Sequence, residues 1–298
     1  MATVDLAQLP PPQIIEVLDF EVILADVKVV MIAAFPDEQQ ASVAAALKLE
    51  SEPLTILAQV IAYRELMLRQ RINEGVAACM LSHSVSTDLD NLAGNLNTER
   101  LVRIPATETT DAEMESDTAL RLRAQSAFEG LSVAGPTGAY EYFAKSASGK
   151  VADARATSPS PAVVVVSILS TEGDGTASDE LIATVNDTLS ADDKRPVADR
   201  LTVQSAEIVN YEIDALLYLY PGPESEPILS AADDALRAWL AEQGKIGRDV
   251  ARSAIMAALH VQGVQRVVLL NPPEDIVIDD TQAARCISHT INVGGTDE

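Results

Sequence analysis

The pattern of apolar and polar residues changes character near Gly135. Before it, apolar residues recur at helical spacing in 13–35, 41–48 and 51–80, a repeat that predicts helices. After it, helical repeats alternate with stretches of period two, such as YEIDALLYLY over 211–220, which predict strands. The sequence therefore predicts an α+β protein, with a mainly helical N-terminal region followed by two small mixed α/β modules with hairpins.

Shifts in composition along the chain predict four segments. An extended and helical N-terminal arm is expected over 1–40, followed by a mainly helical domain over 41–130. A middle α/β module then spans 131–205, and a C-terminal α/β module spans 206–298. The acidic, Thr-rich run TETTDAEMES over 107–116 is typical of a linker or an exposed loop.

The predicted helix over 51–80 has two separate apolar faces, with Arg64 and Arg71 between them. Its apolar residues form one stripe of Ile56, Val60, Tyr63 and Met67 and a second stripe of Leu57, Ile61, Leu68 and Ile72. At about 100° per residue the two stripes lie roughly 120° apart. Such a helix is either buried inside its own domain or packed on another chain. The candidate protein-interaction residues are Ile56, Leu57, Val60, Ile61, Arg64, Leu68 and Arg71.

The stretch VADARATSPSPAVVVVSIL over 151–169 predicts a hairpin. An alternating run meets a Pro-marked turn and then an apolar run, so the first strand is expected to be half exposed and the second buried. A similar order of helix, Gly, strand, Pro turn and strand occurs 113 residues later, around GVQRVVLLNPPEDIVI over 263–278. We therefore predict two related α/β modules in tandem, each with a hairpin at its core.

Composition excludes some classes of function. The 298 residues include 45 acidic against 21 basic residues, a formal net charge of −24, and such a surface repels phosphate backbones and anionic membranes. Nucleic acid and membrane are therefore not expected as partners. Cys79 and Cys286 form no CxxC pattern, so neither a disulfide framework nor a zinc site is predicted. The first residues lack a secretory signal pattern, which favours synthesis and assembly in a cytoplasm.

Patterns that resemble catalytic or ligand sites have simpler explanations. GLSVA over 130–134 approximates a nucleophile elbow, but charged helical sequence precedes Ser132 where the elbow needs a strand. His289 lies among apolar residues of a predicted strand, with no acidic partner at useful spacing, and is interpreted as a packed residue rather than a base. His83 near Asp88 is explained by a helix cap rather than a metal site, and no phosphate-binding loop motif occurs. No cofactor is expected.

An ordered series of segments resembles the baseplate J-like proteins of contractile phage tails. The series consists of STDLDNLAGNLNTERLVR (86–103), LSVAGPTGAYEYFAKSASGKVADARATSPSPAVVVVSILS (131–170), ADDKRPVADRLTVQSAEIVNYEIDALLYLYPG (191–222) and GVQRVVLLNPPEDIVIDD (263–280). The resemblance runs from about residue 45 to 295. The chain departs from the family at 84–86, where members often have Gly and this chain has Ser-Val-Ser, and residues 1–40 have no clear counterpart.

The resemblance implies a structural baseplate wedge component of a contractile phage tail or tailocin, located in the virion. Copies of the chain would form a ring around the tail hub, contacting each other, the hub or spike, neighbouring wedge proteins and tail-fibre-connecting proteins. The ring would rearrange when the sheath contracts, and the family supplies no catalytic residues. The alternative hypothesis is a tail-associated enzyme that degrades cell-envelope polysaccharide. That activity needs acidic pairs in an aromatic-lined cleft, and aromatic residues make up only 4% of this chain.

Overall fold

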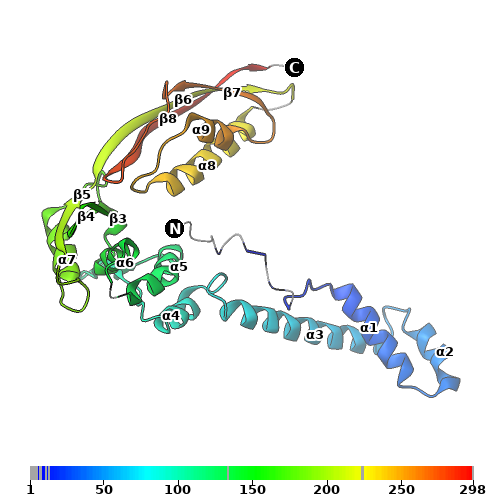
Figure 1. Ribbon diagram of the computed structural model, residues 1–298. Helices are drawn as coiled ribbons and strands as arrows, with labels where there is room; N and C mark the ends of the chain where they lie inside the picture. Colours follow the sequence, from blue (N-terminus) through cyan, green and yellow to red (C-terminus); the bar gives the residue numbers. More distant parts are fainter. Residues whose placement is uncertain are drawn as a thin grey trace. The chain divides into compact units, whose positions relative to one another are not determined.

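The computed structural model describes residues 6, 9, 10, 12, 14–132, 134–222 and 225–296. The chain divides into two compact units, 1–95 and 96–298. Among the described residues the first unit is helical, and the second combines helices with three small sheets (Figure 1). The α+β class with a mainly helical N-terminal region is confirmed. The predicted extended segment through Pro12 lies largely outside the described residues.

The first unit is built on the packing of its first helix against its longest one. Its helices are α1 (Phe20–Ala33), α2 (Asp37–Ala46), α3 (Pro53–Ala78) and α4 (Ser86–Gly94). The carboxylate of Asp19 caps α1 by accepting hydrogen bonds from the backbone amides of Glu21 and Val22. Ile23, Leu24 and Val27 of α1 pack against the small side chains of Ala58 and Ala62 on α3. Alanine at both positions lets the two helices approach closely.

The second unit opens with a small sheet and a helix joined by a buried ion pair. Strands β1 (Val102–Ile104) and β2 (Glu113–Met114) pair antiparallel, and α5 (Asp117–Ser126) and a 3-10 helix (Ala127–Leu131) follow. Arg123, 5% exposed, donates to both carboxylate oxygens of Glu115, at 3.1 and 2.7 Å. The linker predicted over 107–116 therefore contains β2, and its end at Glu115 is fixed to α5.

The middle module contains the predicted hairpin. After α6 (Thr137–Ala147), strands β3 (Val151–Ser160) and β4 (Val163–Ser170) pair antiparallel. Helix α7 (Asp179–Leu189) then leads to β5 (Arg200–Ser205), which pairs parallel to β4. The sheet order β3-β4-β5 makes β4 the central strand, which pairs along both edges, a position that favours an apolar sequence.

Burial along β4 alternates more than the sequence predicts. Val164 and Val166 are buried against α6 and α7, whereas Val163 and Val165 are half-buried. The expectation of a fully buried strand is therefore wrong over its first residues. The two helices cover one face of the sheet, and the other face of β4 becomes buried only from Ser167 onward.

The C-terminal module begins one residue after the middle module ends, because Ala206 alone separates β5 from β6 (Glu207–Leu219). Two helices, α8 (Glu226–Gln243) and α9 (Arg252–Leu259), follow β6 and lie against the same face of the sheet (Figure 1). Strand β7 (Val264–Asn271) pairs antiparallel to β6, and β8 (Gln282–Thr296) pairs parallel to it on the opposite side.

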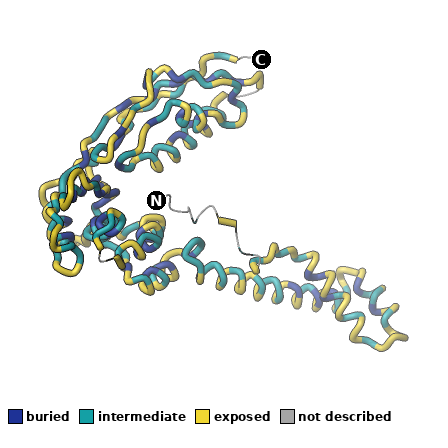
Figure 2. The backbone as a smooth tube through the Cα atoms, in the orientation of Figure 1, coloured by how far each residue is buried: buried dark blue, intermediate teal, exposed yellow. Residues whose placement is uncertain are grey.

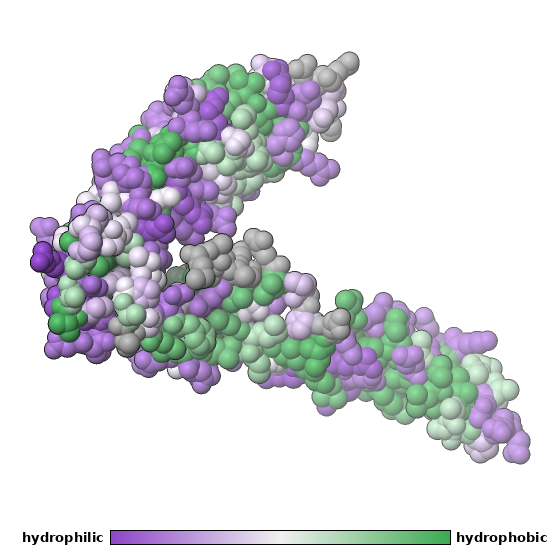
Figure 3. Space-filling view, viewed as in Figure 1, coloured by the Kyte–Doolittle hydropathy of each residue, from purple (hydrophilic) through white to green (hydrophobic). Residues whose placement is uncertain are grey.

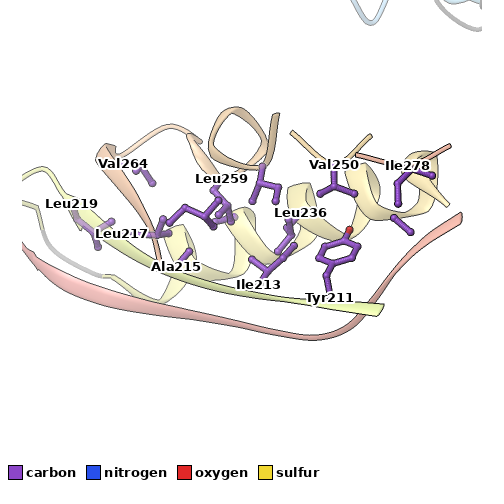
Figure 4. Packing of buried hydrophobic residues seen from close by; sticks show 14 residues of the cluster. Tyr211, Ile213, Ala215, Leu217, Leu219, Leu236, Val250, Leu259, Val264 and Ile278 are labelled. Carbon is purple, nitrogen blue, oxygen red and sulfur yellow. The ribbon is translucent and has the colours of Figure 1, made fainter. Parts of the chain in front are cut away.

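Alternation along β6 supplies the core of this module. Tyr211, Ile213, Ala215, Leu217 and Leu219 face the helices and are buried, as the period-two sequence predicts (Figure 4). Leu236 of α8 and Leu259 of α9 are completely buried against them. Burial of these side chains stabilises the module, at roughly 1.5–3 kcal/mol for each large one.

The second predicted hairpin is wrong. Residues 272–281 form no strand, and β7 pairs with β6 rather than with the segment around Ile276. Pro272 and Pro273 remove two backbone donors at this point, and Ile276 exchanges backbone hydrogen bonds with Val250, at 2.9 and 3.0 Å. The two modules therefore share a helix followed by a strand, but not a repeated hairpin.

Candidate functional site

The contact face of α3 within its own unit is narrow. Its buried residues are Thr55, Ala58 and Ala62, and Leu66 is partly buried one turn further on. All four lie on one stripe at helical spacing. This 26-residue helix therefore packs against α1 through a single stripe of residues. The rest of its surface does not contact α1.

Both apolar stripes of α3 are exposed. The exposed fractions range from 41% at Ile61 to 61% at Leu68, and the exposed apolar residues of the helix are Ile56, Leu57, Val60, Ile61, Tyr63, Met67, Leu68 and Ile72. Figure 2 shows exposed positions recurring along α3, and Figure 3 shows hydrophobic residues gathered over α1 and α3. The interpretation of α3 as a helix buried inside its own domain is therefore wrong.

The structure brings the seven candidate interaction residues together on one helix surface. This apolar surface of α3 contains Ile56, Leu57, Val60, Ile61, Arg64, Leu68 and Arg71, all exposed. At about 100° per residue, each stripe lies roughly 120° from the buried stripe and from the other. Soluble monomers rarely expose a large contiguous apolar patch, and such patches mark interaction sites. The geometry leaves room for two further neighbours around α3, in addition to α1.

Charged residues lie along the same helix. Arg71 Nη1 lies 3.5 Å from a carboxylate oxygen of Glu74. Arg69 pairs with Glu65 at 2.6 Å and with Glu16 at 3.1 Å, and the hydrogen bond that Arg69 donates to Glu65 is the main reason why the pKa of Arg69 is raised. These pairs are exposed, so each contributes little to stability.

The segment before α1 is fastened to the C-terminal half of α3. The amide of Asn73 donates to the backbone carbonyl of Glu16 at 2.9 Å, and its carbonyl oxygen accepts from the backbone nitrogen of Glu16 at 3.2 Å. This reciprocal pair and the Arg69–Glu16 ion pair hold residue 16 beside the C-terminal half of α3. The chain entering α1 therefore covers this part of the helix and leaves both stripes open.

Among the residues considered for chemistry, His289 lies in a polar group with Asp233 and Arg237, which the sequence did not predict. His289 Nε2 lies 2.8 Å from Oδ1 of Asp233, and Arg237 Nε donates to Oδ2 of the same carboxylate at 2.7 Å. The hydrogen bond from Arg237, followed by that from His289, lowers the pKa of Asp233. His289 therefore has an acidic partner in the fold, although it has none at useful spacing in the sequence. Asp233 is 56 residues away in the sequence, and no local spacing signals the contact.

This group lies in a shallow cleft between α8 and β8. The cleft has a volume of about 400 Å³ and is lined by Glu226, Leu229, Ser230, Asp233, Arg237, His289 and Ile291. Its lining contains no Phe, Trp or Tyr for stacking on a sugar. Ser132 follows a 3-10 helix rather than a strand, so it does not form a nucleophile elbow.

The described part of the chain has neither a metal-type cluster of side chains nor a helix suited to cross a membrane. No cluster of three or more His, Cys, Asp or Glu side chains has the arrangement of a metal site there. No helix among the same residues combines the length and apolar character needed to cross a membrane. The apolar surface of α3 is therefore the candidate site with the strongest support.

Comparison with known proteins covers almost the whole chain. Residues 50–107 match the baseplate J-like N-terminal domain, residues 132–205 the baseplate J-like central domain, and residues 211–293 the baseplate J-like C-terminal domain. Baseplate protein J of Escherichia phage P2 is 54% identical over 302 residues, and the match covers 100% of both chains. The chain therefore belongs to the baseplate J-like protein family.

Proposed function

We propose that copies of this structural protein of the phage tail baseplate form a ring around the tail hub. In the ring, each copy contacts other copies of itself, neighbouring wedge proteins, the hub or spike, and fibre-connecting proteins. The observation that carries the proposal is the exposure of both apolar stripes of α3. Burial of one large apolar side chain contributes roughly 1.5–3 kcal/mol, so eight of them provide a strong drive for association. The relationship to a baseplate protein J supports a partner within the baseplate.

In this role the chain works without catalysis. The cleft at α8 and β8 is lined by no Phe, Trp or Tyr, which argues against the alternative of a polysaccharide-degrading enzyme. With two exposed stripes, α3 can pack against one partner helix on each stripe. If the contact on one stripe is lost, the contact on the other stripe can persist. We infer that this gives the ring a way to rearrange during sheath contraction without coming apart.

The test is an assembly experiment with Ile61→Glu combined with Leu68→Glu, one residue pair within a single stripe. The full chain is supplied in trans to phage that lack it, and complete tails are counted by electron microscopy. We expect the circular dichroism and melting temperature of the purified variant to match the wild type, because both side chains are exposed. Assembly should fall at least about tenfold, the effect of losing 1.4 kcal/mol of association free energy.

Gln39→Glu combined with Ala41→Glu is the matched control, because it adds the same two negative charges at exposed positions of α2. Its tails should be as numerous as those of the wild type. Val164→Asp is the control for misfolding, since it places a carboxylate at a buried position of β4 and should cost more than about 4 kcal/mol. Normal assembly by the double α3 variant would refute the proposed surface. Clearing of host cell wall by the wild-type chain in a zymogram would revive the enzyme hypothesis.

A further inference from the structure

Strand β8 leaves most of one edge without a backbone partner. Its inner edge pairs with β6 along its whole length. On its outer edge, Ile246 forms a bridge with Ala283, and the backbone nitrogen of Gly247 donates to the carbonyl of Gln282 at 3.0 Å. Within the ranges that the structure describes, no other strand pairs with this edge. The outer edge therefore accepts a backbone partner at its start and is open beyond it.

The open edge contains a regular stretch that lacks the usual protection. The pairing of β8 with β6 shifts register near Ile287 and near Gly294, and the six residues Ser288–Val293 between these points pair without a break. Natural edge strands are commonly protected by charged side chains or proline. From Cys286 to Thr296 the chain has no Asp, Glu, Lys, Arg or Pro, so the regular stretch is available for pairing with another extended chain.

The cleft at α8 lies beside this same stretch. His289 and Ile291 occupy alternate positions of the strand and line the cleft, opposite Glu226 and Asp233 of α8. Side chains alternate between the two faces of a sheet. Alternate side chains of a strand added next to β8 would therefore lie on the helix side, at the mouth of the cleft.

The charge around the cleft selects the chemistry of the partner. Residues 206–298 contain 15 acidic against 6 basic residues. Glu226 is exposed at the cleft, and Asp233 already has two partners in Arg237 and His289. A lysine or arginine entering beside Glu226 would gain a carboxylate partner, whereas a second acidic copy of this chain would meet like charge.

We propose that the outer edge of β8 over Ser288–Val293 binds an extended, basic segment of another protein by strand addition. The added strand continues the β7-β6-β8 sheet, and its alternate lysine or arginine side chains lie over the cleft beside Glu226. Backbone hydrogen bonds then supply affinity, and the cleft supplies selectivity for basic side chains. This site is separate from the apolar surface of α3 and does not depend on it.

The test measures binding of a fluorescent eight-residue peptide that alternates lysine and threonine to the full chain by fluorescence anisotropy. Two further peptides have the same sequence with backbone N-methyl groups. The first peptide is methylated at every lysine, and the second is methylated at every threonine. Only one set of amides faces β8 in an added strand. We therefore expect one methylated peptide to lose binding and the other to retain it. A glutamate–threonine peptide should bind at least tenfold more weakly than the lysine–threonine peptide.

Charge reversal tests the cleft separately. Glu226→Lys should weaken binding of the lysine–threonine peptide by about fivefold, the scale of an exposed ion pair. Glu242→Lys makes the same change at the other end of α8, away from the cleft, and should leave affinity unchanged. Equal binding of both methylated peptides would overturn strand addition. A wild-type dimer in sedimentation that the peptide dissociates would assign the edge to a second copy and overturn the proposed partner.

Discussion

The carboxylate of Asp153 accepts a hydrogen bond from the backbone nitrogen of Ile246, 3.0 Å away and 93 residues later in the sequence. Asp153 belongs to β3 of the middle module, and Ile246 belongs to the turn after α8 in the C-terminal module. The other carboxylate oxygen lies 2.7 Å from Nζ of Lys145. Ile246 itself is buried with Leu169 and Ala283. One aspartate therefore joins the two modules through a polar contact beside an apolar one.

Removing this carboxylate should loosen the junction. Asp153→Ala leaves the backbone nitrogen of Ile246 without its acceptor and Lys145 without its ion-pair partner. We expect the free energy of unfolding to fall by about 2–3 kcal/mol, the range for a buried hydrogen bond to a charged group. Urea unfolding at pH 7 measures the change. Asp187→Ala, at an exposed position of α7, is the control, and an equal effect of both variants would show that the contact contributes nothing.

The ion pair between Arg123 and Glu115 should be the most costly to break. Arg123 also donates to the backbone carbonyl of Glu99, and both partners are largely buried, with side-chain exposures of 5% and 9%. Arg123→Ala leaves a buried carboxylate uncompensated, which costs about 3–5 kcal/mol in the free energy of unfolding.

The neighbouring pair of Arg103 and Glu113 provides the matched control. Its atoms approach to 3.0 Å, but both side chains are about half exposed. Arg103→Ala should therefore cost less than about 1 kcal/mol. If Arg123→Ala and Arg103→Ala lower the free energy of unfolding in urea by similar amounts, burial does not explain the cost of breaking the ion pair at Arg123.

Two glycines should respond to alanine in opposite directions. A Cβ on Gly149 would lie 2.6 Å from the backbone carbonyl oxygen of Val102, so Gly149→Ala forces β1 or the turn to shift. We expect a loss of about 1–3 kcal/mol. A Cβ on Gly75 of α3 meets nothing within 4 Å, and Gly75→Ala should add roughly 0.5–1 kcal/mol. Thermal unfolding of both variants checks the sign, and a stabilised Gly149→Ala would contradict the close approach.

The contacts of Asp233 should make stability depend on pH. Its pKa is lowered in the folded chain, so its contribution is present above the unfolded pKa of about 3.9 and is lost as the pH falls through the folded pKa. Asp233→Asn should lower the free energy of unfolding at pH 7 by less than about 1 kcal/mol, because the carboxylate is partly exposed.

The difference between wild type and Asp233→Asn should shrink as the pH falls below about 4, because the carboxylate of Asp233 then becomes protonated. Asp234→Asn is the control, since Asp234 is the exposed neighbour on the same helix and does not line the cleft. A difference that does not shrink below about pH 4 would mean that another group is responsible.

Local periodicity was enough to predict the long helix and the first hairpin. The helix predicted over 51–80 spans Pro53–Ala78, and the hairpin predicted over 151–169 spans β3 and β4. Both depend on contacts between residues close in sequence, so the spacing of apolar residues carries the information. The sequence also separated the two apolar stripes of α3, because their angular positions follow from helical geometry alone.

Contacts between distant residues could not be predicted in this way. The prediction paired the segment around Ile276 with β7, whereas Ile276 hydrogen-bonds Val250 and the partner of β7 is β6. The same limit applies to His289, whose partner Asp233 comes from another element. Period two predicts a strand but does not specify which strand lies next to it. The boundaries of the four predicted segments stay a prediction.

The parallel pairing of β6 with β8 has a consequence for synthesis on the ribosome. Glu207 pairs with Gln282, 75 residues later, so β6 leaves the ribosome well before its neighbour exists. During that interval β6 can pair with β7 on one side only, and its other edge stays unpaired while α8 and α9 form. Chains released in this interval would expose a long apolar strand edge, a feature that promotes aggregation. The second edge of β6 is therefore covered only when translation has passed through β8, after both helices have been made.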